Sequence, residues 1–171
     1  MKLKVGDCCL FNNGGFYSFV IRLHDFFNLR FSKATHAGIV CRVEKNGVWI
    51  REAIENDGPD FDEYYYEYKW LEKRVAMGNF IVRRPKMRLT NVRRVCESYE
   101  DFEYDWASIF LMPFSVVFST PKVVFCSEAV ARIYYDTSKK QLNISKELNK
   151  HYEKLTPTDL YRTKLLETVY E

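Results

Sequence analysis

The chain has 171 residues, a length that suits one domain spanning residues 1–171. Hydrophobic residues make up 47% and charged residues 29%, which excludes a disordered chain, a collagen and a small disulfide scaffold. Because 26 basic residues are nearly balanced by 23 acidic ones, the net charge of +3 is too small and too mixed for an electrostatic nucleic-acid binder.

The first half of the chain predicts a strand, a helix and a hairpin. A turn leads into a short apolar strand at 5–11, and residues 16–29 are apolar at helical spacing. Two strands follow at 35–43 and 48–54, joined at Asn46-Gly47, a dipeptide typical of tight hairpins.

The second half mixes further strands and helices. An acidic, tyrosine-rich stretch lies at 62–70. We expect strands at 79–83 and 123–125. We expect helices at 91–102, capped by Thr90, and from Cys126 to about 135, and a last short helix starting at 156–160. The basic residues at 83–88 read as a solvated surface. Strands and helices do not alternate as βαβ units, so the prediction is an α+β fold.

The hydropathy pattern and the spacing of the cysteines indicate where in the cell the protein is expected. No apolar run reaches the roughly 18 residues of a membrane-spanning helix, and polar residues interrupt the N-terminus before a signal peptide could form. The five cysteines are irregularly spaced, which favours a reducing, cytoplasmic location. The adjacent Cys8 and Cys9 read as structural, one pointing inward and one outward. No His/Cys spacing is typical of zinc, so we expect no metal and no cofactor.

Cys126 is the first candidate for chemistry. It follows the apolar run at 123–125 and opens a helical pattern, which places its thiol at a helix N-terminus. Unpaired N–H groups and the helix dipole favour an anion there, and the thiolate is the nucleophilic form of cysteine. The alternative is a small buried cysteine that only packs the helix.

His36 and Glu52 are the second and third candidates. His36 opens a strand and precedes Gly38, where the missing side chain allows close approach; it is either a base for a thiol or a satisfied histidine. Alternation places Glu52 on the same inward face as Val48 and Ile50. A buried carboxylate needs a partner, and a histidine on the neighbouring strand is a natural one for it to orient.

The hairpin register leaves two solutions open. A tight two-residue loop at 46–47 places Glu52 opposite Cys41, about 16 Å along the strand from His36 and too far for a hydrogen bond. The same register places Asp57 opposite His36. Either the loop is longer or bulged and Glu52 is the partner, or the orienting group is Asp57 or its neighbour Asn56.

These candidates occur within an ordered set of motifs: Val5-Gly6-Asp7, Thr35-His36-Ala37-Gly38-Ile39-Val40, Glu52-Ala53, Tyr104-Asp105 and Phe125-Cys126-Ser127-Glu128. This set resembles the YiiX/YaeF-like branch of the circularly permuted papain-like amidases, relatives of the NlpC-type peptidases. In unpermuted papain-like enzymes the cysteine precedes the histidine, whereas here His36 precedes Cys126.

The resemblance implies a circularly permuted papain-like fold, with a small antiparallel sheet packed against the helix of the nucleophile. It implies Cys126 as nucleophile, His36 as base and Glu52 as orienting acid, with Tyr104 lining the pocket or assisting the oxyanion. The substrate it implies is a peptide, a cell-wall peptide or another acyl-containing molecule.

Three functions fit these residues. The first is a cysteine hydrolase that cleaves an amide, peptide or isopeptide bond through an acyl-enzyme. The second is an acyltransferase or thioesterase/esterase on lipid acyl groups, in which case the helix at 16–27 would contact a membrane. The third is a non-catalytic binding module that uses the aromatic stretch at 62–70, where Tyr65 and Trp70 are candidate substrate-binding residues, although a half-buried sheet edge explains them equally.

Overall fold

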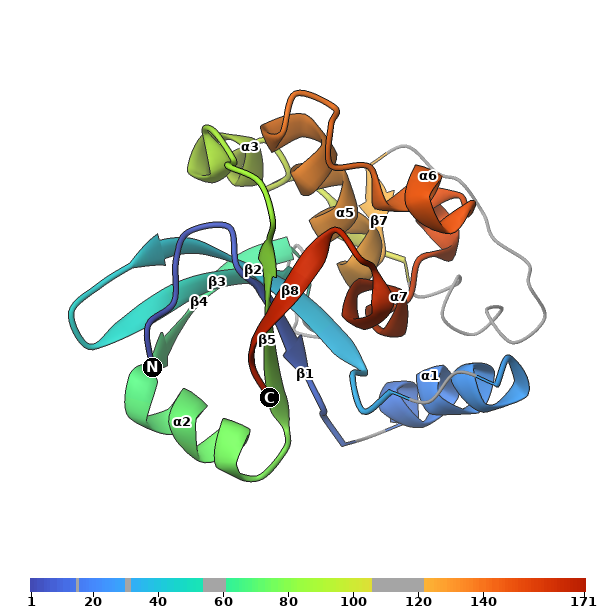
Figure 1. Ribbon diagram of the computed structural model, residues 1–171, viewed down its shortest axis with the longest axis horizontal. Coiled ribbons are helices and arrows are strands. Elements are labelled where there is room, and N and C mark those ends of the chain that lie inside the picture. The colour runs from blue at the N-terminus through green and yellow to red at the C-terminus, as the bar shows by residue number, and fades with distance from the viewer. Residues whose placement is uncertain (15, 30–31, 54–60, 106–121) are drawn as a thin grey trace.

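The computed structural model describes residues 1–14, 16–29, 32–53, 61–105 and 122–171. Its main sheet contains β1 (Cys8–Phe11), β2 (His36–Val43), β3 (Gly47–Ala53), β4 (Phe61–Glu67), β5 (Phe80–Pro85) and β8 (Leu166–Tyr170). All neighbours are antiparallel, in the order β4-β3-β2-β1-β5-β8 (Figure 1). Two short parallel strands, β6 (Glu103–Tyr104) and β7 (Val123–Val124), form a second sheet. The predicted α+β class is confirmed.

Helices cover both faces of the main sheet (Figure 1). The helices are α1 (Phe16–Phe27), α2 (Tyr68–Ala76), α3 (Val92–Glu97), α5 (Cys126–Thr137), α6 (Ile144–Leu148) and α7 (Pro157–Arg162), with a 3-10 turn at Tyr152–Lys154. In the described part of the chain, none of them has the length and apolar character needed to cross a bilayer.

The two faces of the sheet belong to two separate apolar cores. Leu10, Ala37 and Ile39 pack with α3, α5, α6 and α7, whereas Phe11 and Ile50 pack with α2 on the other side. Successive residues of a strand point to opposite faces, so neighbours along β1 enter different cores. Both cores exclude water, which determines how the side chains of the central strands are buried.

The prediction that one of Cys8 and Cys9 points outward is therefore wrong. Cys8 lies in the α5 core and Cys9 in the α2 core, and both are fully buried. A half-exposed strand would have exposed one of them, but helices cover both faces here. All five cysteines are free and buried.

The helix α5 begins at Cys126, as predicted, and is anchored at both ends. Near its start, the Ser127 hydroxyl donates to the carbonyl of Leu155 at 2.6 Å, and the Glu128 carboxylate accepts the N–H of Phe125 at 3.4 Å. Near its end, the phenol of Tyr134 donates to the carbonyl of Gly6 at 2.8 Å. The position of the first residue of α5 is thereby held against the sheet.

Two predictions about helix ends have different outcomes. The predicted helix at 91–102 is only α3, and Thr90 is not its cap: Asn91 occupies that position with φ of 56°, and the Thr90 hydroxyl donates to Thr137 instead. At α7 the cap is Thr156, whose side chain accepts the N–H of Asp159. The carboxylate of Asp159 in turn accepts the N–H of Thr156, completing a capping box.

The basic stretch at 83–88 is the predicted solvated surface only in part: Lys86 and Arg88 are exposed, whereas Arg83 and Arg84 are not. The guanidinium of Arg83 is buried and donates to the carbonyls of Thr163 and Leu166, so it joins the α7–β8 connection to β5. Arg84 donates to the buried carboxylate of Asp7 through Nε and one terminal nitrogen, each at 2.8 Å. Buried cations require such partners, and backbone carbonyls and a carboxylate supply them here.

Candidate functional site

His36 and Glu52 form a hydrogen-bonded pair in the middle of the sheet. The Nε2 atom of His36 lies 2.8 Å from Oε2 of Glu52. The Glu52 side chain is 2% exposed and that of His36 12%. The expectation that Glu52 is buried beside a histidine of the neighbouring strand is confirmed. Asp57, the alternative partner, lies outside the described residues, as does Asn56.

A longer loop and a β-bulge bring this pair together. Val43 pairs with Val48, and the register then shifts at Cys41, so that Glu52 lies opposite Gly38 rather than opposite Cys41. The bulge is decisive, because a shift of one residue moves a side chain to the other face of the sheet. Without it Glu52 would lie opposite Ile39, on the face away from His36; with it, both side chains share one face.

Gly38 leaves the space that the pair occupies. A methyl group at this position would lie 2.6 Å from Cγ2 of Ile50 and 3.0 Å from Cβ of Glu52, closer than real contacts allow. Since Gly38 lies directly opposite Glu52 and two residues from His36, it opens the path between them. The sequence-based expectation of a close approach at Gly38 is confirmed.

Gly38→Ala is therefore expected to push β3 away and break the His36–Glu52 hydrogen bond. Overpacking of this kind lowers the free energy of unfolding by about 1–3 kcal/mol. The pKa of His36 should fall as well, because the variant loses a contact that raises it. Urea unfolding and an NMR titration of the imidazole measure the two effects. Gly14→Ala is the matched control, since a methyl there meets no atom within 4 Å. Equal behaviour of the two variants would contradict this account.

Cys126 contacts His36 from the first turn of α5. Its thiol interacts with the imidazole closely enough to raise the pKa of His36, and it is 0% exposed. The first N–H groups of any α-helix lack intrahelical acceptors, so those at the start of α5 can accept negative charge on a nearby atom. Thiol, imidazole and carboxylate thus form one continuous chain, Cys126–His36–Glu52.

The charge on His36 reflects its two partners. Burial acts to lower its pKa, but the hydrogen bonds and charges of Cys126 and Glu52 outweigh burial and raise the pKa from 6.5 to about 10. At neutral pH the imidazole is consequently held as an imidazolium between two acidic groups. That is the state in which a thiolate is stabilised beside a histidine.

The other cysteines have a different environment. Burial raises the pKa of Cys8 and of Cys9, while a hydrogen bond to Cys41, together with burial, raises the pKa of Cys96. These thiols stay protonated at neutral pH.

Tyr66 belongs to the site, although sequence reasoning did not select it. Its hydroxyl donates to Oε1 of Glu52, the carboxylate oxygen that His36 does not use. Burial and the Glu52 charge raise the pKa of Tyr66, so it remains a donor. Its ring stacks on Trp70 with centroids 5.1 Å apart and contacts Phe11 at 5.8 Å. Phe11 also contacts the imidazole of His36, at 5.9 Å.

The other site residues predicted from the sequence differ in how they relate to Cys126, His36 and Glu52. Trp70 is joined to it through Tyr66, whereas Tyr65 packs on Trp49 with ring centroids 5.4 Å apart. Neighbours along β4 point to opposite faces, which separates Tyr65 from Tyr66. The backbone of Tyr104 pairs with Val124, close to Cys126 in sequence, while its side chain lies outside the described part of the chain.

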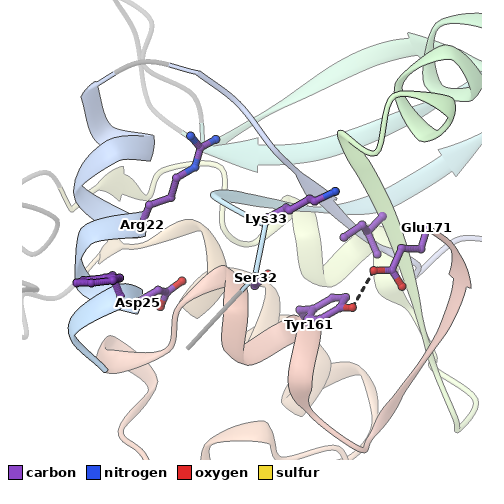
Figure 2. Close-up of a pocket in the computed structure, with 8 residues that line it drawn as sticks. Arg22, Asp25, Ser32, Lys33, Tyr161 and Glu171 are labelled. Carbon is purple, nitrogen blue, oxygen red and sulfur yellow. Dashed lines mark hydrogen bonds between the residues drawn. The ribbon is translucent and has the colours of Figure 1, made fainter. Parts of the chain in front are cut away.

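A cavity of about 500 Å³ lies elsewhere, between α1, α7 and the end of the chain (Figure 2). Arg22 and Asp25 face Tyr161 and Glu171 across it, and Tyr161 donates to Glu171 at 2.7 Å. None of its lining residues belongs to the Cys126–His36–Glu52 chain. Among the residues that the structure describes, no three His, Cys, Asp or Glu side chains gather as they would around a metal ion.

We compared the chain with known protein families and with characterised proteins. No known family model matches the chain, and no characterised protein matches it significantly.

Proposed function

We propose that this protein is a cysteine hydrolase that cleaves an amide, peptide or isopeptide bond through a thioester on Cys126. The observation that carries the proposal is the imidazole of His36, which interacts with the Cys126 thiol on one side and is hydrogen-bonded to the Glu52 carboxylate on the other. A nucleophile, a base and a group that orients the base are the parts that nucleophilic acyl transfer requires.

In this mechanism the proton of the Cys126 thiol already resides on His36, as the imidazolium, and the sulfur attacks the carbonyl carbon of the substrate. The N–H of Cys126, at the start of α5, is positioned to donate to the resulting oxyanion. When the tetrahedral intermediate collapses, the C–N bond breaks and the amine leaves with the proton from His36. Water, deprotonated by His36, then hydrolyses the thioester. Glu52 stabilises the imidazolium in both stages, and Tyr66 holds Glu52 in place.

The proposal extends to the fold as a circularly permuted papain-like domain. Three observations support it: the imidazole comes from a strand that precedes the nucleophile in the chain, the thiol begins a helix, and that helix packs on an antiparallel sheet. The resemblance of the motifs around His36, Glu52 and Cys126 supports it from the sequence side.

Acyl transfer, or thioester and ester hydrolysis, is the second candidate function, and the burial of Cys126 favours it. The thiol is 0% exposed and the imidazole only 12%, so water reaches the sulfur poorly. A thioester shielded from water survives longer, which allows another nucleophile to accept the acyl group.

The test is acetylation by p-nitrophenyl acetate at neutral pH, with the acetyl group located by peptide mass spectrometry. We expect a burst of p-nitrophenol and an acetyl group on Cys126 in the wild type, and neither in Cys126→Ala. Cys41→Ala is the matched control, because Cys41 is also a buried, free cysteine and should leave the burst intact.

A following step separates the candidate functions. Turnover of peptidyl amides of 7-aminocoumarin supports the hydrolase, whereas transfer of the acetyl group from Cys126 to an added amine in preference to water supports acyl transfer. An acetyl group on another cysteine, or an unchanged burst in Cys126→Ala, would overturn both candidates and leave a non-catalytic binding module.

A further inference from the structure

The outward face of α1 is apolar where a surface helix is normally polar. Phe19, Phe26, Phe27 and the following Leu29 are each more than half exposed, whereas Val20 and Ile21 of the same helix are buried. We call these four exposed residues the phenylalanine face. Figure 1 shows α1 at one end of the molecule, outside the layers formed by the sheet and the other helices.

The exposed charges beside the phenylalanine face are basic. Arg22 lies between Phe19 and Phe26 at spacings of three and four residues, which puts all three on one side of the helix. Lys33 lines the same cavity as Arg22 and Phe26, and makes no hydrogen bond or ion pair with the described residues (Figure 2).

The acidic groups nearby are already engaged. Asp25, the sole acid of α1, is 3% exposed, and its carboxylate accepts the hydroxyl of Thr158. Glu171, at the opposite side of the cavity, accepts the hydroxyl of Tyr161. The cations of Arg22 and Lys33 are thus exposed next to the phenylalanine face, with the guanidinium of Arg22 also donating to the side chain of Asn12 and the carbonyl of Asn13.

We propose that α1 docks the protein on an anionic membrane surface. The phenylalanine face would enter the boundary between headgroups and acyl chains, with Arg22 and Lys33 against the lipid phosphates. Phe19 and Phe26 are two turns apart, about 10 Å along the axis, so they reach one plane together. Aromatic and leucine side chains bordered by cations are characteristic of helices that lie in the interface.

The experiment is sedimentation of the full chain with vesicles of phosphatidylcholine, alone or mixed with phosphatidylserine. We expect binding to the anionic vesicles that weakens with added salt. The double substitution Phe26→Ser/Phe27→Ser should weaken that binding at least about tenfold. Arg22→Gln/Lys33→Gln should weaken binding to the anionic vesicles only. Met77→Ser is the matched control, since Met77 and Phe26 are both 62% exposed and Met77 lies on another helix end.

Several outcomes would overturn the proposal. They are the absence of binding to either vesicle, an equal loss in Met77→Ser, and a dimer of the free protein, seen by light scattering, that Phe26→Ser/Phe27→Ser abolishes. The last would assign the face to a contact between two copies. The inference does not depend on the proposed chemistry: Cys126→Ala should bind vesicles like the wild type, and the phenylalanine variant should retain acetylation of Cys126 by the soluble ester.

Discussion

Replacing His36 by alanine is expected to slow the acetylation of Cys126 at neutral pH by about 100- to 10,000-fold. The imidazole interacts with the thiol, and it is the group in this mechanism that holds the thiol proton. Its two partners raise the pKa of His36 to about 10, so the imidazolium persists through neutral pH. A neighbouring imidazolium favours the thiolate form of a cysteine. The rate of the p-nitrophenol burst, measured by stopped flow across a pH series, tests this expectation.

The shape of the pH profile distinguishes a base from a packing residue. The wild-type rate should already be high near pH 7, whereas the rate of the variant should climb through the range where ordinary thiols ionise, around 8.5. Added imidazole should restore part of the lost rate, which a packing defect would not allow. His151→Ala, at an exposed histidine, provides the control. Full activity of His36→Ala would contradict the role of His36 as the base.

The positions of His36, Glu52 and Cys126 differ in how well sequence could predict them. Cys126 was predictable, because the apolar spacing that follows it has a clear helical period and the helix begins there. Glu52 was predictable as a buried carboxylate from its alternation with Val48 and Ile50. Its pairing with His36 was not, because that depends on a loop at 44–47 and a bulge at Cys41, and the Asn46-Gly47 dipeptide favoured a tighter turn.

Tyr66 shows the same limit at the next strand. The tyrosine run was recognised, but the choice of Tyr65 rather than Tyr66 depends on the register between β3 and β4. Val48 lies opposite Tyr66, so alternation along the strand places Tyr66 on the Glu52 face and Tyr65 on the other. No signal that we recognised in the sequence specifies that register. The strand β8 was missed for a related reason: it is short, and its partner β5 is distant in the chain.

Glu52→Ala is expected to lower the free energy of unfolding by about 3–5 kcal/mol near neutral pH. The substitution leaves the imidazolium of His36 and the hydroxyl of Tyr66 without their shared acceptor in a buried site. Urea unfolding followed by tryptophan fluorescence measures the loss. Tyr66→Phe is the matched control: it removes a single hydrogen bond to the same carboxylate and keeps the ion pair, at a cost of about 1.5–3 kcal/mol.

The two variants should differ in their dependence on pH. The folded pKa of His36, about 10, lies above its unfolded value of 6.5, so the stability that its charge contributes is fully present below 6.5 and is lost as pH rises through 10. The stability difference between wild type and Glu52→Ala should therefore shrink over that interval. The cost of Tyr66→Phe should stay nearly constant, because the raised pKa of Tyr66 keeps its phenol protonated. A cost of Glu52→Ala that does not change with pH would mean that the pair is a neutral hydrogen bond, and would remove the imidazolium on which the proposed activation of Cys126 depends.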